Sequence, residues 1–218
     1  QLSILQNQLG SLPPEFGNLT QLELLYLGDN QLSTLPSELG NLVNLKVLFL
    51  RENQIGSLPS ELGKLTHLET LELTINQINS LPPEFGNLTN LQSLSMNYNQ
   101  LQDLPPELGK LQNLCHLLLQ SNRLQELPLE MGQLTKLADI DEDCELKLDS
   151  NPLLSPPPEV VAQGTPAILD YLNHQASWHL QQLLISGAIG LGLLMILAFG
   201  IRWRMRRVRK SKRKNDSV

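Results

Sequence analysis

One asparagine returns every 23 residues through more than half of the chain, without an insertion or a deletion. An apolar residue, usually leucine, stands five and three positions before each asparagine, and Leu or Ile stands two positions after it. A Leu-Pro pair then follows at the fifth and sixth positions. A period this short, kept this strictly, predicts a repeat architecture in which every unit has the same local structure. The six asparagines are Asn7, Asn30, Asn53, Asn76, Asn99 and Asn122.

A 23-residue unit is too short to bury its own leucines, so successive units must stack and share one core. The residues just before each asparagine alternate between apolar and polar positions, which predicts a short strand with Leu25 and Leu27 facing inward in one unit. Proline lacks the amide donor that a strand needs, so the Leu-Pro pair ends it. The asparagine amide can both donate to and accept from the backbone of the turn. We therefore expect the asparagines to form a ladder along the stack.

The seventh unit departs from the pattern. Six extra residues lie between Leu137 and Leu148, and this insertion is acidic. After Asn151 and Pro152, the pair Thr165-Pro166 predicts a helix start, with a hydroxyl cap and a proline in the first turn. The apolar residues of this helix are expected to cover the last unit. They are Ile168, Leu169 and Leu172.

The pattern resembles that of leucine-rich-repeat proteins. It is similar to those of bacteria, especially cyanobacteria, and to the repeat arrays of Roc–COR GTPases. The resemblance covers residues 1–172. It rests on the blocks 12–20 and 81–89, both Leu-Pro-Pro-Glu-Phe-Gly-Asn-Leu-Thr, and on the close from Asn151 to Leu172. It implies a curved solenoid with parallel strands on the concave face and short helical or irregular convex segments. No phosphate-binding loop is present, so the resemblance implies no GTPase activity here.

Residues 183–201 contain no charged side chain. As a helix these 19 residues would be about 28 Å long, close to the ~30 Å hydrocarbon core of a bilayer. We therefore expect one transmembrane helix over residues 179–201. Small residues four apart, such as Ser186 and Gly190, make a weak homodimer through this helix one further expectation.

The charge distribution predicts the orientation of this span. Residues 202–218 carry nine Lys or Arg and one acid, whereas residues 1–201 carry seven Lys or Arg and 21 acids. The positive-inside rule places the basic tail in the cytoplasm and the repeats outside. A cytosolic repeat domain with a tail anchor is the alternative. The side chains expected at the interface or against anionic lipid are Trp178, Trp203, Arg202, Arg204, Arg206, Arg207, Arg209 and Lys210.

The sequence predicts no catalytic site, cofactor or metal. The four histidines share no metal-ligand spacing, and the acidic insertion lacks the glycine and glutamate of a calcium loop. Cys115 stands at a surface position of its repeat and Cys144 in the insertion, and two cysteines alone give no disulfide framework. Whether they pair is not determined by the sequence.

Variation is concentrated at the strand positions that point away from the core. Large apolar side chains and an arginine gather there in the second and third repeats, a composition typical of binding anchors. The expected partner-binding residues are Leu24, Tyr26, Val47, Phe49, Arg51 and Glu72.

These observations divide the chain into repeats (1–154), a capping helix with linker (155–178), a transmembrane helix (179–201) and a basic tail (202–218). They predict a membrane-anchored module that binds a protein partner on the concave face and does not bind nucleic acid. Two alternatives remain: a regulatory fragment of a larger GTPase or kinase, and a structural spacer. The chain opens inside a repeat at Gln1, without a Met, so we expect a fragment or a processed product.

Overall fold

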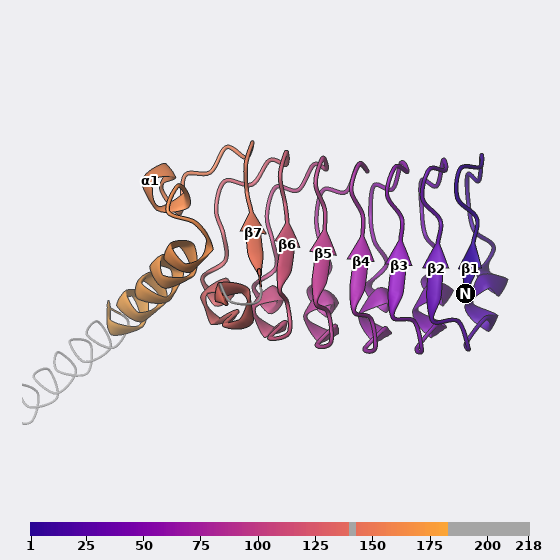
Figure 1. Ribbon diagram of the computed structural model, residues 1–218, viewed down its shortest axis with the longest axis horizontal. Helices are drawn as coiled ribbons and strands as arrows, with labels where there is room; N and C mark the ends of the chain where they lie inside the picture. Colours follow the sequence, from indigo (N-terminus) through magenta and orange to yellow (C-terminus); the bar gives the residue numbers. More distant parts are fainter. Residues whose placement is uncertain (140–142, 183–218) are drawn as a thin grey trace, which may run out of the picture. The chain divides into compact units, whose positions relative to one another are not determined.

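The computed structural model describes residues 1–139 and 143–182. The chain divides into two compact units, Gln1–Gln175 and Ala176–Val218. The first unit is a solenoid whose repeats lie side by side in chain order (Figure 1). Within the described residues its strands form one parallel sheet, in the order β1 to β7. These strands are β1 (Leu2–Ser3), β2 (Leu24–Tyr26), β3 (Val47–Phe49), β4 (Thr70–Glu72), β5 (Ser93–Ser95), β6 (His116–Leu118) and β7 (Glu145–Lys147).

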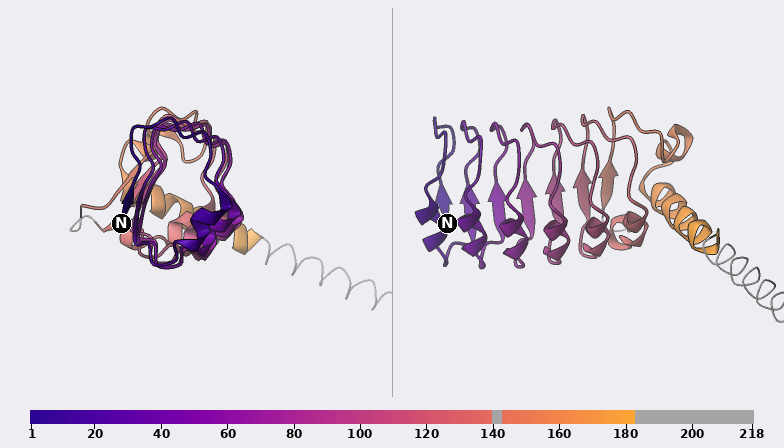
Figure 2. Two further views of the ribbon diagram at one scale, coloured as in Figure 1. Left: turned by 90° about the vertical axis from the view of Figure 1, so that its right-hand side faces the viewer. Right: turned by 180° about the vertical axis from the view of Figure 1, so that it is seen from behind.

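Short 3-10 helices lie across the core from the strands, and the turns of successive repeats nearly superimpose when viewed along the array (Figure 2). Each of the first six follows the proline of its Leu-Pro pair, which stands at the N-cap position. The convex segments are therefore helical, as expected. They are η1 (Pro14–Asn18), η2 (Ser37–Asn41), η3 (Ser60–Lys64), η4 (Pro83–Asn87), η5 (Pro106–Lys110), η6 (Leu129–Gln133) and η7 (Lys136–Ala138).

The core is one continuous cluster that runs through all the repeats. Leu25 in β2 and Leu27 directly after it are fully buried, as are their equivalents Leu48 and Leu50 in the next repeat. The alternation in the sequence therefore identified the inward face correctly. Because each repeat buries its leucines against the next, the hydrophobic stabilisation belongs to the stack rather than to any single unit.

The predicted asparagine ladder is present. In Asn53, Nδ2 donates to the carbonyls of Leu50 in its own repeat and Leu27 in the preceding one, both at 3.0 Å. Its Oδ1 accepts from the Leu32 amide of the preceding repeat, also at 3.0 Å. The same bonds recur at Asn76. Each such asparagine therefore joins two successive turns and leaves no buried amide atom without a partner.

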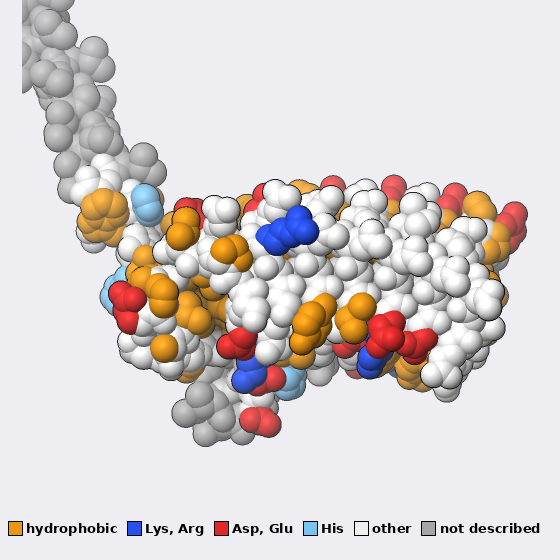
Figure 3. All heavy atoms as spheres, turned by 90° about the horizontal axis from the view of Figure 1, so that it is seen from above, with side chains coloured by type: hydrophobic (Ala, Val, Ile, Leu, Met, Phe, Trp, Pro, Cys, Tyr) orange, Lys and Arg blue, Asp and Glu red, His pale blue; other side chains and the backbone are white. Residues whose placement is uncertain are grey.

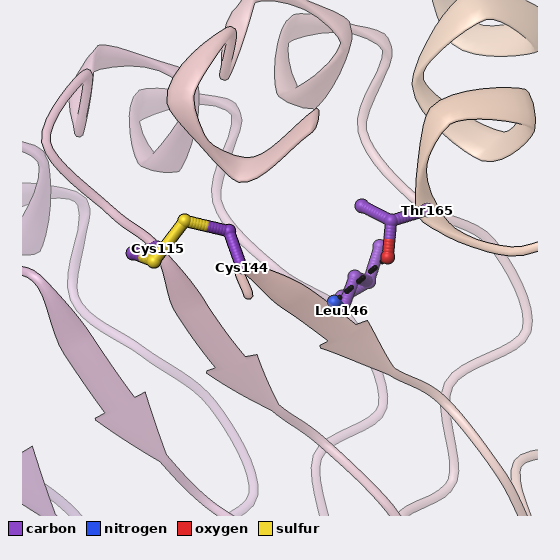
Figure 4. Close-up of a disulfide and its surroundings, with 4 residues drawn as sticks. All are labelled: Cys115, Cys144, Leu146 and Thr165. Carbon is purple, nitrogen blue, oxygen red and sulfur yellow. Dashed lines mark hydrogen bonds between the residues drawn. A yellow bond between two sulfur atoms is a disulfide. The ribbon is translucent and has the colours of Figure 1, made fainter. Parts of the chain in front are cut away.

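The last repeat is closed by two features that lie on either side of β7 (Figure 4). Cys115 and Cys144 form a disulfide, with their Cα atoms 4.6 Å apart. His116 of β6 pairs with Glu145 of β7, so the two cysteines occupy equivalent positions of neighbouring repeats. The 29-residue separation is one repeat plus the six inserted residues. Cys115 is buried, which corrects the expectation that it lies at the surface.

The second closing feature is the segment after the repeats. It contains helix α1 (Pro158–Val161) and a helix that begins at residue 165 and continues to the last described residue, 182. Ile168, Leu169 and Leu172 are buried in the core, as predicted for a cap. The expected role of Thr165 as the helix cap was wrong. The first helical bond runs from the Ile168 amide to the Gly164 carbonyl, and the Thr165 hydroxyl instead accepts from the Leu146 amide of β7 at 2.9 Å.

One glycine per repeat sets how closely neighbouring turns approach. A Cβ added at Gly63 in η3 would lie 2.4 Å from the carbonyl oxygen of Glu84 in η4. The equivalent glycines of four other repeats show the same contact, at 2.3 to 2.5 Å. Backbone cannot yield as a flexible side chain can, so a methyl group here must push two repeats apart.

We predict that Gly63→Ala lowers the free energy of unfolding by about 1–3 kcal/mol, the usual cost of overpacking. Gly56→Ala is the matched control in the same repeat, because a Cβ there would meet nothing within 4 Å. It should change the free energy of unfolding by less than about 1 kcal/mol. Urea denaturation followed by circular dichroism measures both. Equal effects of the two substitutions would contradict this account of the stacking distance.

Candidate functional site

The outward side chains of the strands form straight rows, because the strands pair in register. Leu24 pairs with Val47, and Val47 with Thr70. Two positions further along the strands, Tyr26 pairs with Phe49, and Phe49 with Glu72. The structure therefore brings five of the six predicted partner-binding residues together on β2, β3 and β4.

The apolar part of this surface is built on two neighbouring strands. The rings of Tyr26 and Phe49 lie 5.2 Å apart at an interplanar angle of 32°. Leu24 and Val47 lie beside them in the adjacent row, and all four side chains are half-buried. We call these four residues the strand patch. It combines exposed apolar area with a backbone fixed by the sheet, so a partner could bind without ordering a loop.

Charged groups border the strand patch. Arg51 lies just beyond β3, is exposed, and forms an ion pair with Glu52. The pKa of Arg51 is raised, mainly by its hydrogen bond with Glu52 and further by Asp29 and Glu72. Glu72 is held by the Thr74 amide, which donates to its Oε1 at 2.8 Å. Arg51, the sixth predicted residue, therefore lies at the border of the strand patch, where it interacts with acidic side chains.

Sequence reasoning missed a second row beside the strand patch. The residue directly before each asparagine has a positive φ, between 53° and 58° in the second to fifth repeats. These residues are Asp29, Glu52, Ile75 and Tyr98. The sequence shows that these four residues recur at one position of the repeat. It does not reveal their positive φ, because such a φ is uncommon at residues other than glycine and the residue types give no sign of it. We call these four residues the turn row.

The two acids of the turn row interact directly. Asp29 and Glu52 occupy the same position of successive repeats, and the interaction between their carboxyl groups is the main cause that raises the pKa of Asp29. Arg51 holds the pKa of Glu52 below its ordinary value. Asp29 therefore binds its proton more readily than an isolated aspartate, while Glu52 remains the charged partner of Arg51.

Of the predicted membrane-interface residues, the structure describes Trp178 alone. Its ring is exposed and lies 5.5 Å from that of His179 in a T-shaped arrangement. Trp203 and the predicted basic residues from Arg202 to Lys210 lie outside the described residues, as do residues 183–201 of the expected span 179–201. In the described part, no helix is both long and apolar enough to cross a bilayer. The same part contains no group of three or more His, Cys, Asp or Glu suited to a metal ion.

Comparison with known families agrees with the repeat architecture. Residues 1–55 match the family described as leucine rich repeat, and residues 37–101 match the leucine-rich repeat region. No curated protein shows significant sequence similarity to the chain. Residues 1–101 therefore contain leucine-rich repeats, and the first unit has the architecture of a leucine-rich-repeat solenoid.

Solved structures with the same fold come from bacteria and plants. A leucine-rich-repeat protein of Leptospira interrogans is 39% identical, with a TM-score of 0.66 over 74% of this chain and 40% of that protein. The plant peptide hormone receptor RGFR1, in complex with RGF2, is 30% identical, with a TM-score of 0.59 over 69% of this chain and 23% of that one. The chain therefore spans less than half the length of either protein.

A third similar structure is the ectodomain of the membrane receptor kinase GASSHO1/SCHENGEN3 from Arabidopsis thaliana. It was solved in complex with Casparian strip integrity factor 2. It is 31% identical, with a TM-score of 0.57 over 69% of this chain and 18% of that one. Two of these three proteins were thus solved with a bound partner.

Proposed function

We propose that this chain is a recognition module that binds a protein partner through the outward face of its strands, and that it has no catalytic role. The observation that carries the proposal is the strand patch, where Tyr26 and Phe49 lie against each other on two paired strands. Large aromatic residues on a rigid surface are the commonest binding anchors. The two plant receptors solved with bound partners support the same use of the fold.

Packing of the leucine core does not require the aromatic pair, whereas binding of a partner would give it an energetic role. Both rings point away from the leucine core, which is already filled by the inward residues Leu25 and Leu48. Further burial of these rings by a partner would remove apolar surface from water at about 25 cal/mol per Å². Arg51 and Glu72 at the border would then fix orientation through charge.

We predict that Tyr26→Ala combined with Phe49→Ala reduces partner capture at least tenfold and leaves the fold intact. The full chain, carrying a photo-crosslinking residue at Val47, serves as bait in its native cells, and crosslinked proteins are identified by mass spectrometry. Circular dichroism checks the fold of each variant.

The matched control is Leu19→Ala combined with Val43→Ala, which removes two exposed apolar side chains away from the strand patch. Capture should be unchanged in this control. If the Tyr26 and Phe49 variant captures as well as the unaltered chain, the strand patch is not the binding site. If extensive charge reversal across the strand face also has no effect, the spacer alternative holds.

We further propose that residues 179–201 anchor the module in a membrane, with the repeats outside the cytoplasm. The uncharged run over 183–201 and the nine basic residues after it support a single span, with contacts between the basic tail and anionic lipid. A weak homodimer through the span remains part of the proposal. The disulfide adds an independent argument for the orientation, because disulfides persist in oxidising compartments and are rare in the cytosol.

This orientation predicts that protease added to intact cells digests the repeats and leaves the basic tail protected. It also predicts that Cys115 and Cys144 of the full chain stay unlabelled by a membrane-permeant maleimide until a reductant is added. Substituting Cys115→Ser should make the remaining thiol reactive, which controls for access to the label. Protected repeats with thiols that react without reductant would reverse the orientation.

A further inference from the structure

The turn row is the strongest feature that the proposed function leaves unused. It lies beside the strand patch, and Figure 3 shows acidic and hydrophobic side chains following one another along this edge of the repeats. Its backbone is fixed, because each amide donates to a carbonyl of the next repeat. The Asp29 amide donates to Arg51 at 3.0 Å, and the Ile75 amide donates to Asn97 at 2.9 Å. The row therefore presents one side chain per repeat at a regular spacing.

The apolar half of the turn row is difficult to explain by folding. Ile75 and Tyr98 are 43% and 60% exposed, so they gain little from burial. Both have a positive φ, of 58° and 55°, which is unfavourable for a β-branched or bulky residue. Asparagine, aspartate or glycine would adopt this conformation at lower cost. Two large exposed apolar side chains at neighbouring strained positions indicate a surface that is used.

The acidic half of the row has an excess of negative charge. Asp29, Glu52 and Glu72 are the acids that act on Arg51, which is the basic residue among them. Asp29 and Glu52 occupy the same position of successive repeats, and the Asn30 amide donates to the Glu52 carbonyl at 3.1 Å. A second cation placed over this pair would relieve the repulsion between the two carboxyl groups. Residues 1–182 as a whole carry 21 acids and seven Lys or Arg, so the net negative charge of this part of the chain also favours a basic ligand.

We propose that the turn row binds an extended peptide segment in which a basic residue and an apolar residue lie about three positions apart. The basic residue would contact Asp29 and Glu52, and the apolar residue would contact Ile75 and Tyr98. Neighbouring strands are about 4.8 Å apart, so the centres of the two pairs are roughly 10 Å apart along the row. An extended chain covers that distance in about three residues. This proposal rests on the proposed function, and names the chemistry of the partner.

The test is a direct binding measurement on the full chain in nanodiscs. The probe is the fluorescein-labelled peptide Ser-Gly-Lys-Arg-Ser-Leu-Tyr-Ser-Gly, together with the same peptide in reversed order. Two altered versions replace Lys-Arg by Glu-Asp, or Leu-Tyr by Ser-Ser. Fluorescence anisotropy should show binding of at least one order of the parent peptide. Each altered version should bind at least tenfold more weakly.

Two double variants locate the peptide on the row. Asp29→Asn with Glu52→Gln, and Ile75→Ser with Tyr98→Ser, should each weaken binding of the parent peptide at least tenfold. The matched control is Glu38→Gln with Glu61→Gln, which removes the same charge from the same two repeats, on η2 and η3. Binding to this control should stay within twofold of the unaltered chain.

The outcomes separate this inference from the proposed function. No binding of either parent peptide, or equal loss in the control, overturns the inference. Partner capture that depends on Tyr26 and Phe49 would still uphold the proposed function in that case. Self-association that Ile75→Ser with Tyr98→Ser abolishes would show that a second copy of the chain occupies the row, and would also overturn the inference.

Discussion

The side-chain amide of one asparagine per repeat is the interaction on which the rest of the structure depends. Asn53 joins the carbonyl of Leu27 and the amide of Leu32 in the preceding repeat to its own turn. Those backbone groups are buried, and leaving one unpaired costs on the order of 1–3 kcal/mol. The leucines supply the burial, but the asparagine fixes the register in which they are buried.

Because the register between repeats is fixed, equivalent positions of the repeated motif form a continuous surface. Because each strand pairs residue for residue with the next, the outward positions become rows whose composition varies independently of the core. Tyr26 and Phe49 meet for this reason, although they are 23 residues apart. The register of the strands therefore fixes where the outward side chains lie without restricting which residues they are. This arrangement suits recognition, in which the same fold must serve many partners.

The sequence predicted those parts of the structure that repeat, and missed those that depend on local backbone or on contacts made once. The strands, the inward leucines and the asparagine ladder all followed from period and spacing. The turn row did not, because a positive φ at Ile75 leaves no trace in composition. The Cys115–Cys144 pairing could have been found by noting that register resumes after the six-residue insertion. The use of Thr165 by Leu146 required the three-dimensional contact itself.

Hydrogen exchange at four backbone amides tests the central claim most directly. The amides of Leu32, Ile55, Ile78 and Leu101 each donate to the Oδ1 of the next repeat's asparagine. They lie in turn segments, where exchange is ordinarily fast, so protection equal to that of the strand amides is expected only if the ladder holds. Asn76→Ala should abolish the protection of Ile55 first. Exchange of all four amides at the rate of open loops would contradict the account.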